Sequence, residues 1–321
     1  MFDRHDLTDA EWARLEPLLP DRTPRRGGRW SDHRQVINGI LWRTRTGSPW
    51  RDVPDCYGDF RTLHGRHRRW SADGTWETVL TALQADSDRD AEPEWAVGMD
   101  STVVRAHRHA AGARTSRPRT CRPRSWHRYC PRRPATQGAG SNDNNPGSTS
   151  TPPAKRVDRE ALGRSRGGLS TKIHLLADPR CRPLVRATTA GQRHDALAFE
   201  PLMRRLRVRR TGPGRPRTRP DRLLADKAYS NRTTRAHLRR RRIAATIPEK
   251  TDQQQARAAK GSAGGRPPAF DAESYKQRNT VERAINKLKD FRGVAMRTDK
   301  REFVYQGTID IEVFSPASAG E

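Results

Sequence analysis

The chain has few cysteines and no long apolar run, and each shortage excludes a class of protein. Its 321 residues contain four cysteines (Cys56, Cys121, Cys130 and Cys181), and none are spaced as a CxxC pair. No stretch reaches the roughly 18 apolar residues that a membrane-spanning helix needs. The first residues, MFDRHDLTDAEW, lack the basic and apolar regions of a signal peptide. A cytoplasmic protein with reduced thiols is therefore expected, rather than a secreted or membrane-spanning one.

Apolar and acidic residues are also scarce. The hydrophobic fraction is 32 %, below the roughly 45–50 % of globular chains, so part of the sequence is expected to stay outside a core. With 64 Lys+Arg against 37 Asp+Glu, the net charge is +27. Such a charge favours a polyanionic partner, with nucleic acid first and an anionic membrane surface as the alternative. Because 55 of the basic residues are arginines, GC-rich codons explain part of the bias.

Tryptophan is concentrated near the N-terminus, where six of the eight lie within the first 76 residues. This pattern predicts a small helical domain over residues 1–88 with its own aromatic core. Thr8 and Glu11 have capping-box spacing, which predicts a first helix directly after Thr8. Apolar residues at helical spacing predict a second, a third and a fourth helix, of which the third begins near Asp59.

Arginines on the predicted third helix stand apart from its apolar face. Arg61, Arg66 and Arg69 are the residues expected to contact DNA, because an exposed basic helix of a small helical domain can enter a major groove. The alternative is a solvated helix in an arginine-rich protein.

From residue 94 the pattern changes to strands followed by alternating strands and helices, which predicts an α/β domain over 94–305. WAVGMDSTVVRA, TKIHLLAD, LVRATT, RLLAD and IAATIP are the predicted strands. Asp195 is expected to cap a helix that follows it, with a role next to the active site as the alternative. The composition of about 112–163 predicts a disordered insertion, and residues 306–321 are expected to form an atypical C-terminal tail, because the chain finishes in the short polar stretch VFSPASAGE.

Two aspartates and one predicted helix carry the chemistry. Asp100 and Asp226 each follow an apolar run, and polar residues at strand ends of α/β sheets often line a site, although a turn or cap is the commoner role. Carboxylates there could hold Mg²⁺. On a helix expected over about 271–292, Tyr275, Arg278, Glu282 and Lys289 fall within an arc of about 60°. The alternative is a solvated charged face.

These segments resemble a known family. YKQRNTVERAINKLKDFRG resembles the Tyr-x2-Arg-x3-Glu-x6-Lys signature of bacterial insertion-sequence transposases, and GMDSTVVRAHRHAAGA and LLADKAYS resemble the segments around its first two catalytic aspartates. LTDAEWARLEPLLP and GSPWRDVP resemble the leading domain of the insertion-sequence-five group. The likeness covers about 5–110 and 160–305. It implies an RNase-H-like mixed sheet with flanking helices, preceded by a small all-helical DNA-binding domain.

The resemblance also implies an activity. Asp100, Asp226 and Glu282 would be the catalytic triad and the ligands of two Mg²⁺ ions, with Mn²⁺ as a substitute, while Tyr275, Arg278 and Lys289 would grip transposon-end DNA. The enzyme would cleave double-stranded DNA at terminal inverted repeats and transfer the 3′-OH strands to target DNA, as a homodimer at the bacterial nucleoid. The alternatives are an inactive relic that only binds DNA and a basic RNA-binding protein.

Overall fold

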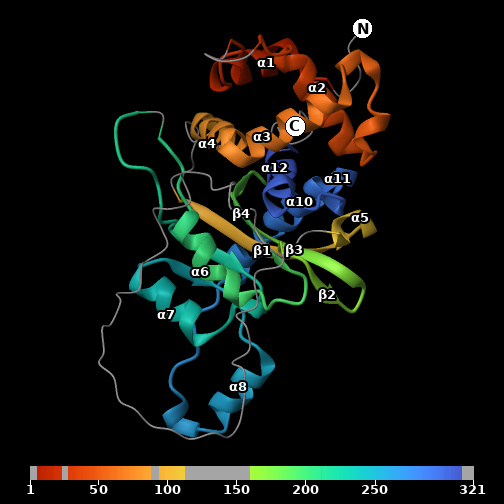
Figure 1. Ribbon diagram of the computed structural model, residues 1–321. Coiled ribbons are helices and arrows are strands. Elements are labelled where there is room, and N and C mark those ends of the chain that lie inside the picture. The colour runs from red at the N-terminus through yellow and green to blue at the C-terminus, as the bar shows by residue number, and fades with distance from the viewer. Residues whose placement is uncertain (1–5, 24–27, 88–93, 113–159, 211, 313–321) are drawn as a thin grey trace, which may run out of the picture.

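A computed structural model describes residues 6–23, 28–87, 94–112, 160–210 and 212–312 (Figure 1). The expected insertion therefore lies mostly outside the described residues. Its last residues do not, because Glu160 accepts a hydrogen bond from the Glu302 backbone at 2.8 Å and pairs with Arg301 at 3.2 Å. Residues 160–162, which the prediction placed inside the insertion, thus belong to the described fold.

Helices make up the N-terminal part, as predicted. The longer ones are α1 (Asp9–Leu15), α2 (His33–Thr46), α3 (Phe60–Asp73) and α4 (Thr75–Ser87), joined in part by the 3-10 helices η1 (Glu16–Leu18), η2 (Trp50–Asp52) and η3 (Asp55–Tyr57). The capping box of α1 is confirmed, with Glu11 N donating to Thr8 Oγ1 at 3.3 Å and Thr8 N to Glu11 Oε2 at 2.8 Å. Asp59 caps α3 as the sequence indicates.

The aromatic core of these helices is shared with the other end of the chain. Trp70 and Trp76 are fully buried and meet edge to face at 4.9 Å, but Ile311 of α12 (Glu302–Glu312) belongs to the same apolar cluster. Nearly every residue of α12 from Val304 on is buried. The expectation of an atypical tail is therefore wrong for residues 306–312, and the helix crosses the boundary predicted at 305.

The second part of the chain is a mixed sheet. Its strands are β1 (Ala96–Ala106), β2 (Gly163–Ser165), β3 (Gly168–Ala177), β4 (Pro183–Ala190), β5 (Arg222–Ala225), β6 (Ala244–Thr246) and β7 (Met296–Arg297). The main strands lie in the order β4-β3-β1-β5-β6, with the first three antiparallel and the last two parallel to β1. Three antiparallel strands continued by two parallel ones give the RNase-H-like sheet that was expected.

Helices cover both faces of the sheet. On one face α6 (Ala196–Arg205) and α7 (Arg232–Arg240) pack with Val97 and Met99 of β1, and on the other α10 (Asn279–Lys289) packs with Val104. The shorter helices are α5 (Arg108–Ala111), η6 (Lys227–Tyr229), α8 (Thr251–Ala258), η7 (Gly261–Gly264), α9 (Ala272–Lys276) and α11 (Arg292–Ala295). The segment after Glu249 is partly helical, since it contains α8 and η7. None of the described helices has the length and apolarity needed to cross a membrane.

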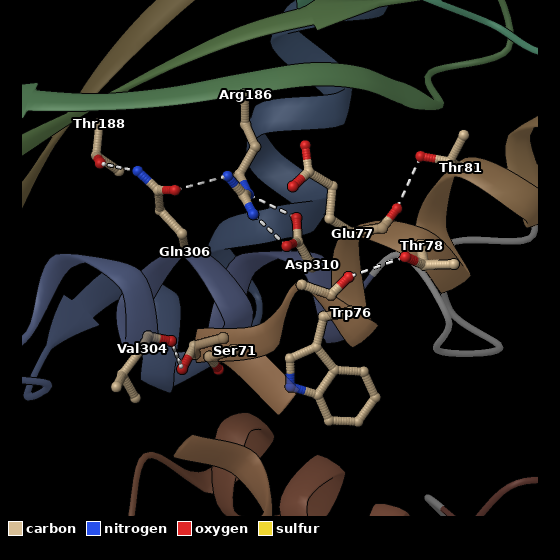
Figure 2. Close-up of polar contacts among 12 residues, drawn as sticks. Ser71, Trp76, Glu77, Thr78, Thr81, Arg186, Thr188, Val304, Gln306 and Asp310 are labelled. Carbon is tan, nitrogen blue, oxygen red and sulfur yellow. Dashed lines mark hydrogen bonds and ion pairs between the residues drawn. The ribbon is translucent and has the colours of Figure 1, made fainter. Parts of the chain in front are cut away.

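Polar contacts attach α12 to the edge of the sheet (Figure 2). Arg186 of β4 donates from Nε to Asp310 Oδ1 at 2.5 Å and from Nη1 to Gln306 Oε1 at 3.1 Å. Gln306 in turn donates to Thr188 Oγ1 at 2.9 Å. Because Asp310 is 2 % exposed, this ion pair lies within the protein, between the sheet and the N-terminal helices.

A buried histidine at the same junction predicts a pH dependence of stability. Trp76 Nε1 donates to His67 Nδ1 at 3.2 Å, so the other ring nitrogen carries the proton and donates to Thr308 Oγ1 at 3.1 Å. Burial lowers the pKa of His67 to about 4 from 6.5. The unfolded chain therefore binds more protons than the folded chain between about pH 6.5 and 4, and the free energy of unfolding falls as pH falls through that window.

We expect His67 alone to lower this free energy by about 2 kcal/mol between pH 7 and pH 5. Urea unfolding of the wild type and of His67→Gln at both pH values measures the effect. The variant should lose less stability on acidification by that amount. An equal loss in both proteins would show that His67 accepts a proton in the folded state.

Candidate active site

The two aspartates are brought together by strand register. β1 and β5 run parallel with Met99 opposite Ala225, so Asp100 and Asp226, the next residue of each chain segment, lie side by side where this pairing stops. Asp226 ends the strand as predicted, but Asp100 does not. It lies in the middle of β1, because β3 continues to pair with β1 as far as Arg105.

Glu282 reaches the same place from α10. The helix approaches β1 closely at Gly98, where an added Cβ would come within 2.9 Å of Val281 Cβ. The guanidinium of Arg278 then pairs with Asp100 Oδ2 at 3.1 Å and with Glu282. One arginine thus joins two of the predicted catalytic acids.

The helix that carries these residues is interrupted, contrary to the prediction of one helix over about 271–292. α9 ends at Lys276 and α10 begins at Asn279, and Arg278 N, Thr280 N and Val281 N all bond to carbonyls three residues back. Tyr275 still lies near Arg278, whose guanidinium carbon is 5.6 Å from the ring centroid. Lys289 is exposed on the last turn of α10, about 10 Å along the helix from Glu282.

Burial and charge act on the site in opposite directions. Burial raises the pKa of Asp100, although the Ser101 backbone and Arg278 partly offset this. Burial alone would lower the pKa of Arg278, but the negative charges of Asp100, Glu282 and Asp226 help to raise it. Arg278 is therefore fully protonated and serves as the counter-charge of the acidic cluster.

Asp100, Asp226 and Glu282 have the chemistry of ligands for a hard cation. Arg278 is paired with two of them, however, and the three carboxylates are not arranged as a metal site. Carboxylate oxygens are the ligands that Mg²⁺ prefers. Within the described ranges no three His, Cys, Asp or Glu side chains are placed to hold a metal ion. Arg278 engages the same carboxylates that a cation would use, so cation binding requires this guanidinium to release them.

Asp195 is attached to the site, which the sequence did not make clear. It stands at the start of α6 but makes no capping hydrogen bond. Its carboxylate instead accepts from Ser101 Oγ at 2.7 Å and pairs with Lys172 Nζ at 2.8 Å. Burial alone would raise the pKa of Asp195, but the hydrogen bonds from Lys172 and Ser101 outweigh it and lower the pKa. The expected cap is therefore wrong, and Asp195 anchors the strand next to Asp100.

Substitution of Asp195 by serine separates these two roles. Serine caps helices as well as aspartate, so a cap would tolerate the change. It cannot pair with Lys172, whose side chain is 12 % exposed, and we expect the free energy of unfolding to fall by about 2 kcal/mol. Chemical unfolding measures the loss. A change of less than about 0.5 kcal/mol would favour the cap.

The arginines predicted to contact DNA on α3 divide into two groups. Arg61 and Arg69 are exposed, as expected. Arg66 is 7 % exposed and lies 4.1 Å from the Trp30 ring centroid, with Nη1 2.9 Å from His33 Nδ1. Its predicted exposure is wrong because the segment around Trp30 covers that side of α3, and burial lowers the pKa of Arg66 to about 10.

Two family descriptions match the chain in the order of its two parts. Residues 7–80 match a putative transposase of the IS4/5 family, and residues 92–308 match a transposase DDE domain. Because the second match spans more than half of the sequence, the chain belongs to the family of DDE transposases. The resemblance noted in the sequence is thereby confirmed.

Two relatives match part of the chain, and the second is encoded by an insertion element. The uncharacterised protein y4sN of Sinorhizobium fredii is 37 % identical over 125 residues, which are 39 % of this chain and 95 % of that protein. A 16.2 kDa protein of insertion element IS402 of Burkholderia cepacia is 35 % identical over 111 residues, or 31 % of this chain and 73 % of that protein.

Solved structures of a transposase show a fainter likeness. The Mos1 paired-end complex with the left transposon end is 14 % identical, with a TM-score of 0.25 over 89 % of this chain and 78 % of that one. The Mos1 strand transfer complex is 12 % identical, with a TM-score of 0.24 over 90 % and 78 %. At such scores neither structure places a residue of the site.

Proposed function

We propose that this transposase cleaves DNA at the ends of an insertion element and joins the freed 3′-OH strands to target DNA. The observation that supports this most directly is the strand register that sets Asp100 beside Asp226, together with the Arg278 bridge from Asp100 to Glu282. Two of these carboxylates pair with Arg278, and the third, Asp226, lies beside Asp100 on the neighbouring strand. Clusters of carboxylates of this kind hold the metal ions of phosphoryl-transfer enzymes, in which the protein itself does little covalent chemistry.

Asp100, Asp226 and Glu282 are the residues that would hold Mg²⁺, with Mn²⁺ as a substitute. When bound, the two ions would activate the attacking oxygen and stabilise the leaving one. Until then Arg278 neutralises Asp100 and Glu282 and keeps them close together. Once released, its planar guanidinium suits a DNA phosphate.

DNA at the element ends would contact the residues next to the triad and those of α3. Tyr275 and Lys289 flank the acidic cluster on α9 and α10, and Arg61 and Arg69 project from α3. Two ends must be held together for transposition, which favours a homodimer on DNA in the bacterial nucleoid. Arg66 is not included among these DNA-contacting residues, because it is buried against Trp30.

Nicking of a duplex that carries the element's inverted repeats tests the proposal. We expect strand cleavage with Mg²⁺ or Mn²⁺ and none with a chelator, and binding in both conditions. Binding without cleavage under any metal would identify the inactive relic instead. Tighter binding to RNA than to repeat-bearing DNA, with no cleavage, would identify an RNA-binding protein.

A further inference from the structure

A projecting segment between α6 and β5 carries exposed arginines that neither pack in the core nor belong to the candidate active site. Four of them, Arg209, Arg210, Arg215 and Arg219, are exposed. Within the described part of the chain none of the four forms an ion pair, and residues 201–220 contain no Asp or Glu. In Figure 1 the segment leaves the body of the molecule on the side of α4. We call residues 207–210 and 212–219 the arginine arm.

The base of the arginine arm is fixed to the core. Val208 N donates to Arg217 O at 2.9 Å and Arg217 N to Val208 O at 2.8 Å. Val208 is 3 % exposed within the apolar cluster under α6, and Arg217 stacks 4.4 Å from the Trp95 ring centroid. Arg241 at the end of α7 donates to Thr218 O at 2.9 Å. The exposed arginines of the arm therefore project from a base that is fixed to the core. Arg239 and Arg240, near the end of α7, are exposed as well.

The arm lies at the opposite end of the sheet from the acids. Trp95 immediately precedes β1, and Arg219 lies three residues before β5. Four strand residues separate this end of β5 from Asp226, which is about 13 Å. A duplex lying at the acids would therefore meet the arm only if it extends past the cleaved phosphate.

From this placement we infer that the arginine arm binds the phosphate backbone of duplex DNA away from the cleavage site. Four like charges held together repel one another, and no described carboxylate offsets them. Guanidinium groups match phosphate oxygens in pairs, and nearby like charges strengthen attraction to a polyanion. The inference rests on the proposed function for the identity of the polyanion, but its test needs no cleavage.

The test measures binding to random-sequence duplexes of about 10 to 40 base pairs, without divalent metal, across a range of salt. R210Q/R215Q removes two arm charges, and R14Q/R164Q removes two exposed charges in α1 and β2 as a matched control. On the longest duplex we expect the log–log salt slope of the arm variant to be shallower by about 1.8, since each phosphate contact contributes about 0.9. The control should change by less than half of that.

Two further outcomes decide the inference. On the shortest duplexes the arm variant should still show a shallower slope than the control, because ten base pairs span about 34 Å and reach past the roughly 13 Å between the acids and the arm. R210K/R215K should restore the slope, since lysine keeps the charge. Equal effects of the arm variant and the control on long DNA, or a larger effect on RNA than on DNA, would overturn the inference. If the wild type shows no metal-dependent nicking, the proposed function is refuted, but the effect of the arm variant on the salt slope still decides the inference.

Discussion

Replacement of Asp226 by asparagine should reduce metal-dependent nicking about a thousandfold while leaving DNA binding intact. Asparagine keeps the shape of the side chain and removes the charge that a metal ion needs. Loss of a metal ligand at a phosphoryl-transfer site costs several kcal/mol of transition-state stabilisation, and about 4 kcal/mol corresponds to three orders of magnitude. Nicking rates and binding isotherms on the same repeat-bearing duplex measure the two effects separately.

Asp252→Asn is the matched control for this substitution. Asp252 is an exposed acid in α8, so its loss changes the net charge equally. We expect this variant to nick at the wild-type rate. Unimpaired nicking by Asp226→Asn would remove Asp226 from the mechanism, whereas equal damage by both variants would point to a general effect of charge.

Removal of the buried carboxylate on α12 should give the largest loss of stability. Asp310→Ala leaves the Arg186 guanidinium without its main partner in a position where its side chain is 14 % exposed. An uncompensated buried charge costs about 3–5 kcal/mol. For a chain of this size the thermal midpoint should fall by about 6–20 °C. Thermal and chemical unfolding of the full chain measure the loss.

Two comparisons show whether the charge itself is responsible. R186M/D310L replaces both partners by apolar groups of similar size and should recover most of the stability. Glu200→Ala breaks a comparable arginine–carboxylate pair on α6 whose side chains are 70 % and 50 % exposed, and it should cost less than about 1 kcal/mol. If Asp310→Ala costs no more than Glu200→Ala, the pair in Figure 2 is screened by water rather than buried.

Local signals in the sequence were sufficient for most helices and strands. The capping box at Thr8 and Glu11 and the apolar run before Asp226 depend on residues within a few positions, and both are found as predicted. The pairing of β1 with β5 is not local, but the order of strands and helices already favoured a sheet in which Asp100 and Asp226 could meet. The resemblance to transposases then singled out Asp100, Asp226 and Glu282, whose catalytic role stays a prediction.

Contacts between distant segments account for what the sequence did not predict. Arg66 lies on the polar side of α3 by spacing, yet the segment around Trp30 covers it. The interruption at Arg278 has no glycine or proline to mark it, and it coincides with a contact to Asp100, 178 residues away. Asp195 has the position of a helix cap, but Lys172 and Ser101 engage its carboxylate instead. In each case a partner from elsewhere decides the role of the side chain.

The burial of α12 has a consequence for synthesis on the ribosome. Ile311 completes the apolar cluster of the N-terminal helices, and Thr308 accepts the hydrogen bond of His67. The N-terminal helices therefore cannot complete their apolar core until α12, the last of the described helices, has been made. We expect a chain that ends before Glu302 to leave this apolar cluster open to water and to be cut more readily by proteases than the full chain.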